Sequence, residues 1–453
     1  MTDFRKYKPE VVGEIDFHLP NIETSKFSNI SLYHVTKGNL PICQLEIIID
    51  CGSKLDPLGK EGLTHLTAMM LDEGAGKYTS LQLSEEFEKI GSIFSISSDK
   101  DAIQISVLSL EEYIDRSIEL ISLVLLQPTL AENDFEREKK KLIDKILQSK
   151  DNPSNVANEI FDKIIYHDSG YSNSIIGNTE SVSSISLDDV IDFHKNVLLN
   201  KTWSIISVGS FNNEKIREIL NRYLRNDSKQ MSVEENNFSI EKQSNTQIYI
   251  VDHKGAAQTE LMIGHISTKR NDGDYFFKHL LNSVLGGQFT SRINLNLRED
   301  KGYTYGAGSS FNYNQNAGAF YVSTSVQSEV TGNAVKEILY ELNRIKDGVT
   351  EEELDFAKSS LIKRFPSQFE TYSQVANNIS NIITHNLQLD YYNSYITKIN
   401  NSTIEQVNKA GIEDIQPDNL AIVCVGNANI IEAQLKQILN FEMITMDKNG
   451  NRI

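Results

Sequence analysis

The sequence repeats itself after about 220 residues, and this duplication is the strongest constraint on what the chain can fold into. The segment Leu130–Phe135 (LAENDF) matches Val349–Leu354 (VTEEEL), at an offset of 349 − 130 = 219 residues. The segment Trp203–Gly209 matches Leu420–Gly426, at an offset of 426 − 209 = 217 residues. Two matches in the same order and nearly the same register indicate a duplicated unit of domain size, not a short solenoid repeat.

The duplication predicts two homologous halves joined by a polar linker. The most polar stretch of the chain, residues 226–245, lies at its midpoint and has little apolar periodicity, as expected of a connection between domains. We therefore expect four parts: an N-terminal extension over residues 1–27, a first domain over 28–225, the linker over 226–245, and a second domain over 246–453. Each domain is long enough to bury its own core.

Strand and helix patterns alternate within each half. Residues 94–97, 103–107 and 320–326 alternate between apolar and polar side chains, which is typical of half-buried antiparallel strands. Residues 80–90 and 110–126 repeat apolar side chains three and four apart, which predicts helices. We expect an α+β fold in which each half is an antiparallel-rich sheet with helices packed on one face.

Charge and hydropathy exclude several classes of partner. The net charge is −18, from 44 basic and 62 acidic residues, and such a field repels nucleic acid. No run approaches the ~20 apolar residues of a membrane span, and the first residues lack the apolar core of a secretory signal. We therefore expect a cytoplasmic protein, or one of the periplasm or another compartment if a signal was trimmed. Cys43, Cys51 and Cys424 form no CxxC pair, which favours reduced structural thiols.

Three segments together resemble one known family. They are a helix predicted over Gly62–Gly74, the segment Leu285–Arg292 (LGGQFTSR) and the segment Asn296–Tyr305 (NLREDKGYTY). With the internal repeat, they resemble the insulinase and mitochondrial-processing-peptidase family of inverted zinc peptidases. The resemblance covers residues 28 to about 445, and it implies the fold of that family.

The zinc motif of that family is degenerate in this chain. In active members, H-x-x-E-H on a helix supplies two zinc ligands and the glutamate that activates the bound water. Here the five positions begin with His65 and end with Ala68 and Met69 in place of the glutamate and the second histidine. The third ligand, a glutamate about 76 residues further on in the family, corresponds to Lys145, whose ammonium repels Zn²⁺. The resemblance therefore implies no metal and no catalysis by this chain alone.

Other readings of the same helix remain open. A single helix histidine such as His65 is more often a packed or surface residue than a ligand. Glu61 and Asp72 stand at spacings from which they could join His65 at a metal, although solvated acids near helix ends explain them more simply. The sequence contains no HExxH, GxSxG, P-loop or EF-hand motif, so no other chemistry is indicated.

The second half keeps the motif that active members use across the substrate. The family pattern Leu-Arg-Glu-x-x-Gly-x-x-Tyr is met from Leu297 to Tyr305, and it implies that Arg298 holds a substrate oxygen and that Tyr305 donates a hydrogen bond to the developing oxyanion. The alternative is that Arg298 pairs with Glu299 or another acid, and that Tyr305 packs in the sheet beside Tyr303. The two glycines of the earlier segment, Gly286 and Gly287, form either a turn over which a peptide passes or a plain helix C-cap.

These residues lead to a functional hypothesis. Some family members pair a zinc-bearing subunit with a second subunit that lacks zinc and supplies the arginine and tyrosine. The sequence resembles the second kind, so we expect a non-catalytic, substrate-binding subunit of a heterodimeric zinc metallopeptidase. It would act on peptides or unfolded segments beside an H-x-x-E-H sibling, with the zinc in that partner. The alternative is a structural scaffold of the same fold with no proteolytic role.

Overall fold

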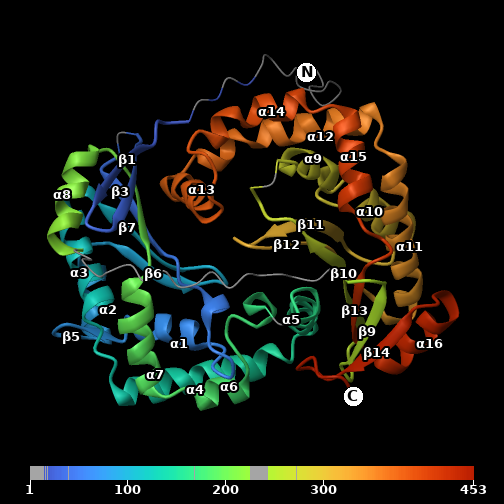
Figure 1. Cartoon of the computed structure of the whole chain (residues 1–453), viewed down its shortest axis with the longest axis horizontal. Helices are drawn as coiled ribbons and strands as arrows, with labels where there is room; N and C mark the ends of the chain where they lie inside the picture. Colours follow the sequence, from blue (N-terminus) through green and yellow to red (C-terminus); the bar gives the residue numbers. More distant parts are fainter. Residues whose placement is uncertain are drawn as a thin grey trace, which may run out of the picture.

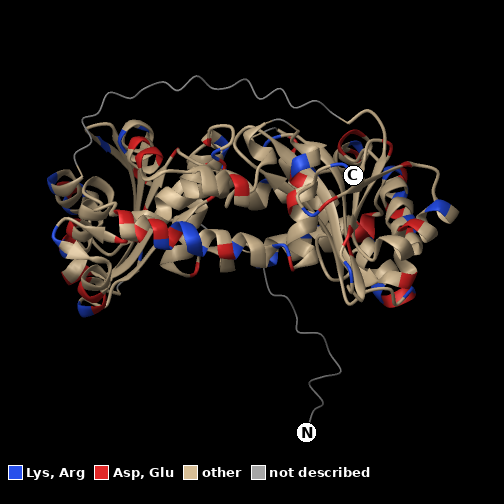
Figure 2. Ribbon diagram, turned by 90° about the horizontal axis from the view of Figure 1, so that it is seen from below, with Lys and Arg blue, Asp and Glu red and all other residues tan. Residues whose placement is uncertain are grey.

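The computed structural model describes residues 15, 17, 19–38, 40–167, 169–224, 243–271 and 273–453, shown in Figure 1. Most of the predicted linker, residues 226–242, lies outside the described residues. The same holds for residues 1–14, 16 and 18 of the predicted N-terminal extension. The described parts form two halves, each built on a six-stranded sheet, and Figure 2 shows basic and acidic residues along the helices of both halves.

The first sheet belongs to the first half. Its strand order is β1 (Glu23–Phe27), β2 (Ile30–Thr36), β8 (Trp203–Gly209), β3 (Ile42–Ile49), β7 (Ile103–Leu110) and β6 (Ile93–Ser98). Only the β2–β8 pair is parallel, and the other pairs are antiparallel. β1 lies inside the segment assigned from sequence to the N-terminal extension, so the sheet begins within that segment.

The second sheet repeats the topology of the first. Its order is β11 (Ala307–Tyr313), β12 (Gly318–Gln327), β10 (Gln258–Ser267), β13 (Ala421–Gly426), β9 (Gln247–Asp252) and β14 (Glu442–Met446). Each of β2, β3, β6, β7 and β8 has a counterpart with the same neighbours and direction. The registers agree as well, because Ile47 pairs with Ile205 in the first sheet and Ile263 with Ile422 in the second. The two halves are therefore homologous, as the duplication predicted.

Helices fill the connections between strands. In the first half they are α1 (Leu63–Met70), α2 (Ser80–Lys89), α3 (Ile114–Leu126), α4 (Glu132–Ser149), α5 (Pro153–Ile165), α6 (Thr179–Ser184), α7 (Leu187–Asp192) and α8 (Asn213–Tyr223). In the second half they are α9 (Tyr275–Leu285), α10 (Arg292–Asn294), α11 (Thr331–Arg344), α12 (Glu351–Arg364), α13 (Tyr372–Thr384), α14 (Tyr395–Asn401), α15 (Ile404–Asp414) and α16 (Ala428–Ile438). A two-stranded ribbon, β4 (Gly74–Ala75) and β5 (Tyr78–Thr79), follows α1.

The inner strands are apolar on both faces because both faces are covered. Along β3, Ile47 and Ile49 pack in the core formed with the helices of the first half, whereas Ile48 packs in a different core. β8 divides in the same way, since Ile205 lies in the first core and Ile206 in the second. Strands buried on both sides read as continuous apolar runs. This explains why these segments lack the alternation that β6 and β7 show.

The second layer on each sheet is a helix contributed by the other half. α5 of the first half packs Val156, Ile160 and Phe161 against the second sheet, where Val251 and Val423 meet them. α13 of the second half packs on β3 and β8 of the first sheet, through Tyr372, Val375, Ala376, Ile379 and Ile382. Figure 1 shows α13 beside the blue strands of the first half and α5 beside the strands of the second. The halves thus exchange equivalent helices, and the bounds of α5 and α13 differ by 372 − 153 = 219 residues.

Two further contacts join the halves. Phe17, from the predicted extension, packs its ring 5.5 Å from that of Phe365 and 5.4 Å from that of Phe369. On the first sheet, the Gln44 side chain accepts a hydrogen bond from Ser373 of α13 at 2.9 Å. The halves are therefore connected by a shared interior as well as by the chain itself.

Candidate functional site

The helix of the degenerate zinc motif is shorter than its sequence predicted. α1 ends at Met70, not at Gly74, which instead begins β4. His65, Ala68 and Met69 all lie on this helix, with Ala68 buried at 3 % exposure and Met69 packed on the first core. The prediction of a helix reaching Gly74 was wrong because that glycine pairs with Thr79 in the β4–β5 ribbon.

His65 is held by the edge strand of the first sheet. Its Nδ1 lies 2.8 Å from Oγ of Ser98 at the end of β6. Burial, and secondarily the positive charge of Lys145, lower the pKa of His65 to about 4. Lys145 of α4 is therefore near enough to His65 for its charge to act on the imidazole. Lys145 also lines a polar pocket of about 900 Å³ between α4, α5 and residues 173–176.

These four positions do not fit a zinc ion. His65 can supply one neutral imidazole nitrogen, whereas Ala68 has no donor atom, Met69 offers only a thioether, and Lys145 a cation. Within the described ranges, no three His, Cys, Asp or Glu side chains lie close enough to hold a metal. The alternative set of Glu61, His65 and Asp72 therefore does not converge, and Oε1 of Glu61 instead accepts the backbone N–H of Gly59 at 2.9 Å.

The second half presents its motif on an unusual turn. Residues Leu295–Asp300 form a π-helix, a conformation that is rare and often found at functional sites. The guanidinium of Arg298 lies with its Cζ 4.4 Å from the ring centroid of Phe289, which is itself 63 % exposed. At 3.4 Å, Nη1 of Arg298 is within ion-pair distance of Glu299 but makes no hydrogen bond. The expected Arg298–Glu299 pair therefore exists and leaves a donor of the guanidinium unused.

Tyr305 projects from a loop that is fixed on both sides. Its side chain is 94 % exposed. Before it, Tyr303 packs against the second core and donates its backbone N–H to the carbonyl of Leu297 at 2.9 Å. The Thr304 hydroxyl also donates to the carbonyl of Ser325 at 2.8 Å, and after Tyr305 the carbonyl of Gly306 accepts the Thr324 hydroxyl at 3.0 Å. The alternative interpretation placed Tyr305 in the sheet, but it is Tyr303 that packs against the core. The side chain of Tyr305 is exposed and does not pack in the fold.

Gly286 and Gly287 end α9 at the edge strand of the second sheet. The backbone N–H groups of both glycines donate to the carbonyl of Asn282, at 2.9 and 2.6 Å, and Ser309 of β11 donates its N–H to Gly286 at 3.0 Å. A Cβ on Gly286 would lie 2.3 Å from Oγ and 2.5 Å from the backbone nitrogen of Ser309. The structure thus gives the C-cap reading a physical reason, and peptide binding by these glycines stays a prediction.

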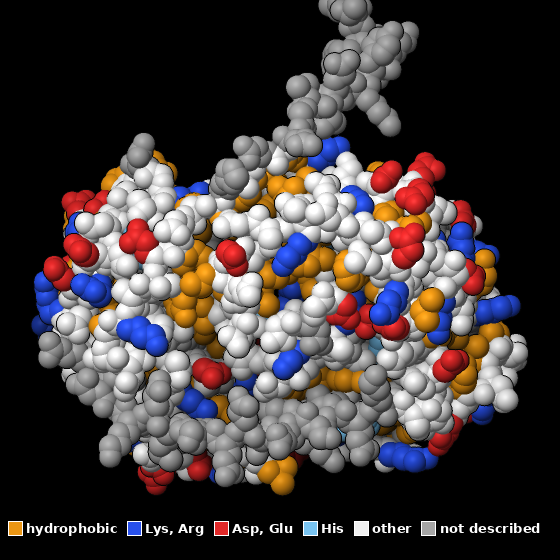
Figure 3. All heavy atoms as spheres, turned by 45° about the horizontal axis from the view of Figure 1, so that its top comes forward, with side chains coloured by type: hydrophobic (Ala, Val, Ile, Leu, Met, Phe, Trp, Pro, Cys, Tyr) orange, Lys and Arg blue, Asp and Glu red, His pale blue; other side chains and the backbone are white. Residues whose placement is uncertain are grey.

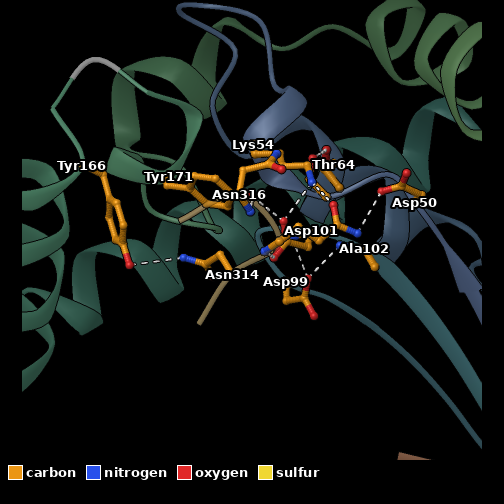
Figure 4. Close-up of polar contacts among 12 residues, drawn as sticks. Asp50, Lys54, Thr64, Asp99, Asp101, Ala102, Tyr166, Tyr171, Asn314 and Asn316 are labelled. Carbon is orange, nitrogen blue, oxygen red and sulfur yellow. Dashed lines mark hydrogen bonds and ion pairs between the residues drawn. The ribbon is translucent and has the colours of Figure 1, made fainter. Parts of the chain in front are cut away.

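The junction between the halves contains residues that the sequence did not single out. Asp101, 5 % exposed, lies in the turn between β6 and β7. It accepts the Tyr171 hydroxyl at 2.6 Å, the Lys54 ammonium at 2.8 Å and the backbone N–H of Gln315 at 3.0 Å. Gln315 belongs to the hairpin between β11 and β12, so this carboxylate anchors the second half onto the first (Figure 4). An aspartate in a polar turn between strands carries no sequence signal of such a contact.

The two predicted sites stay apart. In the described part of the chain, no hydrogen bond, ion pair or ring contact joins His65 or Lys145 of the first half to Arg298 or Tyr305 of the second. The degenerate zinc position and the arginine–tyrosine motif therefore make no direct contact with each other.

Comparison with known proteins agrees with the fold and with the family resemblance. Residues 35–179 match the family described as "Insulinase (Peptidase family M16)", and residues 184–361 match "Peptidase M16 inactive domain". Together these matches span most of the chain. The protein belongs to the insulinase family of peptidases and their inactive relatives.

Individual relatives include proteins named as active and as inactive. A protein of Helicobacter pylori named "Non-peptidase homolog YmxG" is 24% identical over 86% of this chain and 90% of its own length. An "Uncharacterized zinc protease" of Rickettsia felis is 24% identical over 70% of this chain and 76% of its own length. The crystal structure of a peptidase M16 inactive domain from Pseudomonas fluorescens superposes with a TM-score of 0.82, covering 90% of this chain and 98% of that one, at 24% identity. The chain is thus a member of the family that resembles its non-catalytic branch.

Apolar side chains are dispersed over the face that Figure 3 shows, and the cysteines are buried. No helix in the described ranges is both long and apolar enough to cross a membrane. On the face shown in Figure 3, apolar side chains lie in separate small groups between acidic and basic ones. Cys43, Cys51 and Cys424 are buried, and burial raises the pKa of each thiol to about 12. They are therefore inert as nucleophiles at neutral pH.

Proposed function

We propose that this chain is the substrate-binding, non-catalytic subunit of a heterodimeric zinc peptidase, and that it supplies Arg298 and Tyr305 to the active site of a partner. The observation that carries the proposal is the exposure of the Tyr305 side chain. A tyrosine that is 94 % exposed on a loop fixed by hydrogen bonds on both sides does not stabilise the fold. Exposed aromatic side chains on rigid segments are typical of binding sites.

The chemistry of the two side chains fits a peptide carbonyl. The guanidinium of Arg298 lies against the ring of Phe289, and its side chain is 33 % exposed, so it can donate to a substrate oxygen. The phenol of Tyr305 can donate to the oxyanion that forms as the carbonyl is attacked. Both groups would act on a bond that the zinc of the partner activates. The substrate would be a peptide or an unfolded segment held in extended form.

The proposal is tested on the assembled pair. The chain is co-expressed with an H-x-x-E-H sibling, and peptide turnover is compared for Arg298→Ala, Tyr305→Phe and the matched control Tyr303→Phe. Loss of an oxyanion donor typically lowers turnover by a factor of ~10² to 10³. We therefore expect Arg298→Ala and Tyr305→Phe to lower peptide turnover by a factor in this range, while assembly and zinc content stay unchanged. Tyr303→Phe is expected to remain near the wild-type rate.

The scaffold alternative predicts a different result. A respiratory assembly, "Complex III2 from Candida albicans, Inz-5 bound", contains a chain with this fold at a TM-score of 0.75 and 14% identity, which concerns the fold alone. If the pair assembles and all three variants turn over peptide at the wild-type rate, Arg298 and Tyr305 play no part in catalysis. The chain would then be a scaffold.

A further inference from the structure

A second cluster of functional side chains lies at the opposite end of α9 from Gly286. A pocket of about 520 Å³ opens between the N-terminal turn of α9, the segment after α13, and α14. In Figure 1 these elements lie together in the second half. The volume falls within the ~300–1,000 Å³ typical of small-ligand sites. Neither the family motifs nor the proposed function assigns a role to this pocket.

Arg270 is the charged centre of the pocket. Its Cζ lies 3.0 Å from the ring centroid of Tyr275 and 5.0 Å from that of Tyr391. Its Nη1 is buried and has no hydrogen-bond partner, and the buried hydroxyl of Tyr391 has none either. A buried donor left without an acceptor costs about 1–3 kcal/mol, and more for a charged group. Two such groups at one pocket indicate that an acceptor is missing there.

The charges around Arg270 leave the pocket positive. No carboxylate in the described part of the chain forms an ion pair with Arg270 or with Lys398. Lys398 stands at the rim, with Nζ 5.1 Å from the ring of Phe276 and 5.5 Å from that of Tyr391. Asp274, on the neighbouring turn, is paired with Lys278 at 2.8 Å and does not line the pocket. Among the described residues, two cations and no carboxylate therefore line this aromatic pocket.

We propose that this pocket binds a carboxylate attached to an apolar or aromatic group. The planar guanidinium of Arg270 matches a carboxylate through paired hydrogen bonds, Lys398 adds a second positive charge, and the rings of Phe276 and Tyr391 pack against the apolar part. Such a group occurs at the C-terminus of a peptide and in free small acids. The site lies within this one chain and needs no catalytic partner, so its test does not depend on the proposed function.

The experiment is calorimetric titration of the full chain with N-acetylphenylalanine and with its amide, and then with a short peptide that ends in phenylalanine as the free acid or the amide. We expect the free acids to bind. The amides should bind at least ~10-fold more weakly, because they lose the paired charge-assisted hydrogen bonds from the guanidinium. Arg270→Gln is expected to weaken binding of the acids by at least ~10-fold, and Arg270→Lys by less. The matched control is Lys409→Gln, an exposed lysine of α15 paired with Glu413, which should bind as the wild type does.

The outcomes separate the sources of the ligand and decide the proposal. Binding of N-acetylphenylalanine alone, or of both acids, supports a site for the carboxylate group itself, and binding of the peptide acid alone supports a site for a peptide terminus. Equal affinity for acid and amide, wild-type affinity in Arg270→Gln, or no binding of either acid would overturn the proposal. If Arg270→Gln does not fold, Lys398→Gln replaces an exposed side chain and should still weaken binding of the acids several-fold. Unchanged binding there would also overturn it.

Discussion

The same corner of the fold has opposite character in the two halves. In each half, one helix contacts a serine of an edge strand. This helix is α1, which follows β3, in the first half and α9, which follows β10, in the second. His65 of α1 lies 2.8 Å from Ser98 of β6, and Asn282 of α9 accepts from Ser309 of β11 at 2.7 Å. In the first half the imidazole of His65 is partly buried and neutral, whereas beyond α9 the side chain of Tyr305 is almost fully exposed. The duplicated backbone fixes the position of a side chain. The exposure of that side chain decides whether the side chain can act on another molecule.

The largest expected effect is the recovery of zinc binding in the first half. Met69→His and Lys145→Glu together would give three ligands with His65, because the low pKa of His65 already keeps its imidazole neutral, as a metal requires. We expect about one zinc per chain after dialysis, compared with none in the wild type, measured by elemental analysis. Adding Ala68→Glu supplies the base but places a carboxylate at a buried position.

The control for this prediction removes the remaining ligand. His65→Ala in the background of both substitutions should abolish the zinc. A folded double variant that takes up no zinc would show that Lys145 is not at the third-ligand position.

Gly286→Ala tests the corner of the second half. Its Cβ would meet backbone and side-chain atoms of Ser309 within 2.5 Å, so α9 or β11 must shift. Overpacking of this kind costs about 1–3 kcal/mol in free energy of unfolding, measured by urea denaturation. Gly273→Ala, where a Cβ has no neighbour within 4 Å, is the matched control and should stay within about 0.5 kcal/mol of the wild type.

His65→Gln tests the corner of the first half through its pH dependence. The pKa of His65 is lowered from 6.5 to about 4 in the folded chain, so the unfolded chain binds the proton first. The folded state is therefore destabilised as pH falls from about 6.5 towards 4. We expect the variant to lose less stability than the wild type over this window, by on the order of 1–3 kcal/mol.

The comparison must be made between variant and wild type. Burial raises the pKa of Glu46 to about 7 and that of Asp56 to about 6, and carboxyls of this kind oppose the effect of His65 as the pH changes. Parallel stability curves for the two proteins from pH 7 to 4 would show that His65 is not held neutral by the fold.

The smallest expected effect concerns Tyr305. Because its side chain is almost fully exposed, Tyr305→Ala should change the free energy of unfolding by less than about 0.5 kcal/mol. Tyr303→Ala should cost about 1–3 kcal/mol, since Tyr303 packs on the second core. A large loss of stability in Tyr305→Ala, measured by thermal or chemical unfolding, would make this residue structural and weaken the proposed function.

Much of the fold was predictable because its strands carry strong local patterns. The alternation in Ile103–Leu110 and Gly318–Gln327 identified β7 and β12, and the offset between Trp203–Gly209 and Ala421–Gly426 identified β8 and β13 as equivalents. The exchange of α5 and α13 was not predictable, because an apolar helix face does not specify which sheet it covers.

The site was predictable only in part. The motif residues could be named from their resemblance to a family. The sequence could not show that Tyr303 is packed and that Tyr305, two positions later, is exposed, because the loop has no periodicity. Arg270 and Asp101 gave no signal, because each depends on partners far away in the sequence: Tyr391 for Arg270 and Gln315 for Asp101. Such long-range pairings are fixed by tertiary structure alone.

The reciprocal placement of α5 and α13 has a consequence for the origin of the molecule. A single ancestral half that had this helix would leave one face of its sheet uncovered. Two identical copies could cover these faces by exchanging the helix, as in a domain-swapped dimer. Joining two such genes end to end would keep the trade within one polypeptide and let the copies diverge. The present chain has the architecture of a swapped homodimer fused into one polypeptide, in which the chemistry of one half could change while the other half kept its exposed arginine and tyrosine.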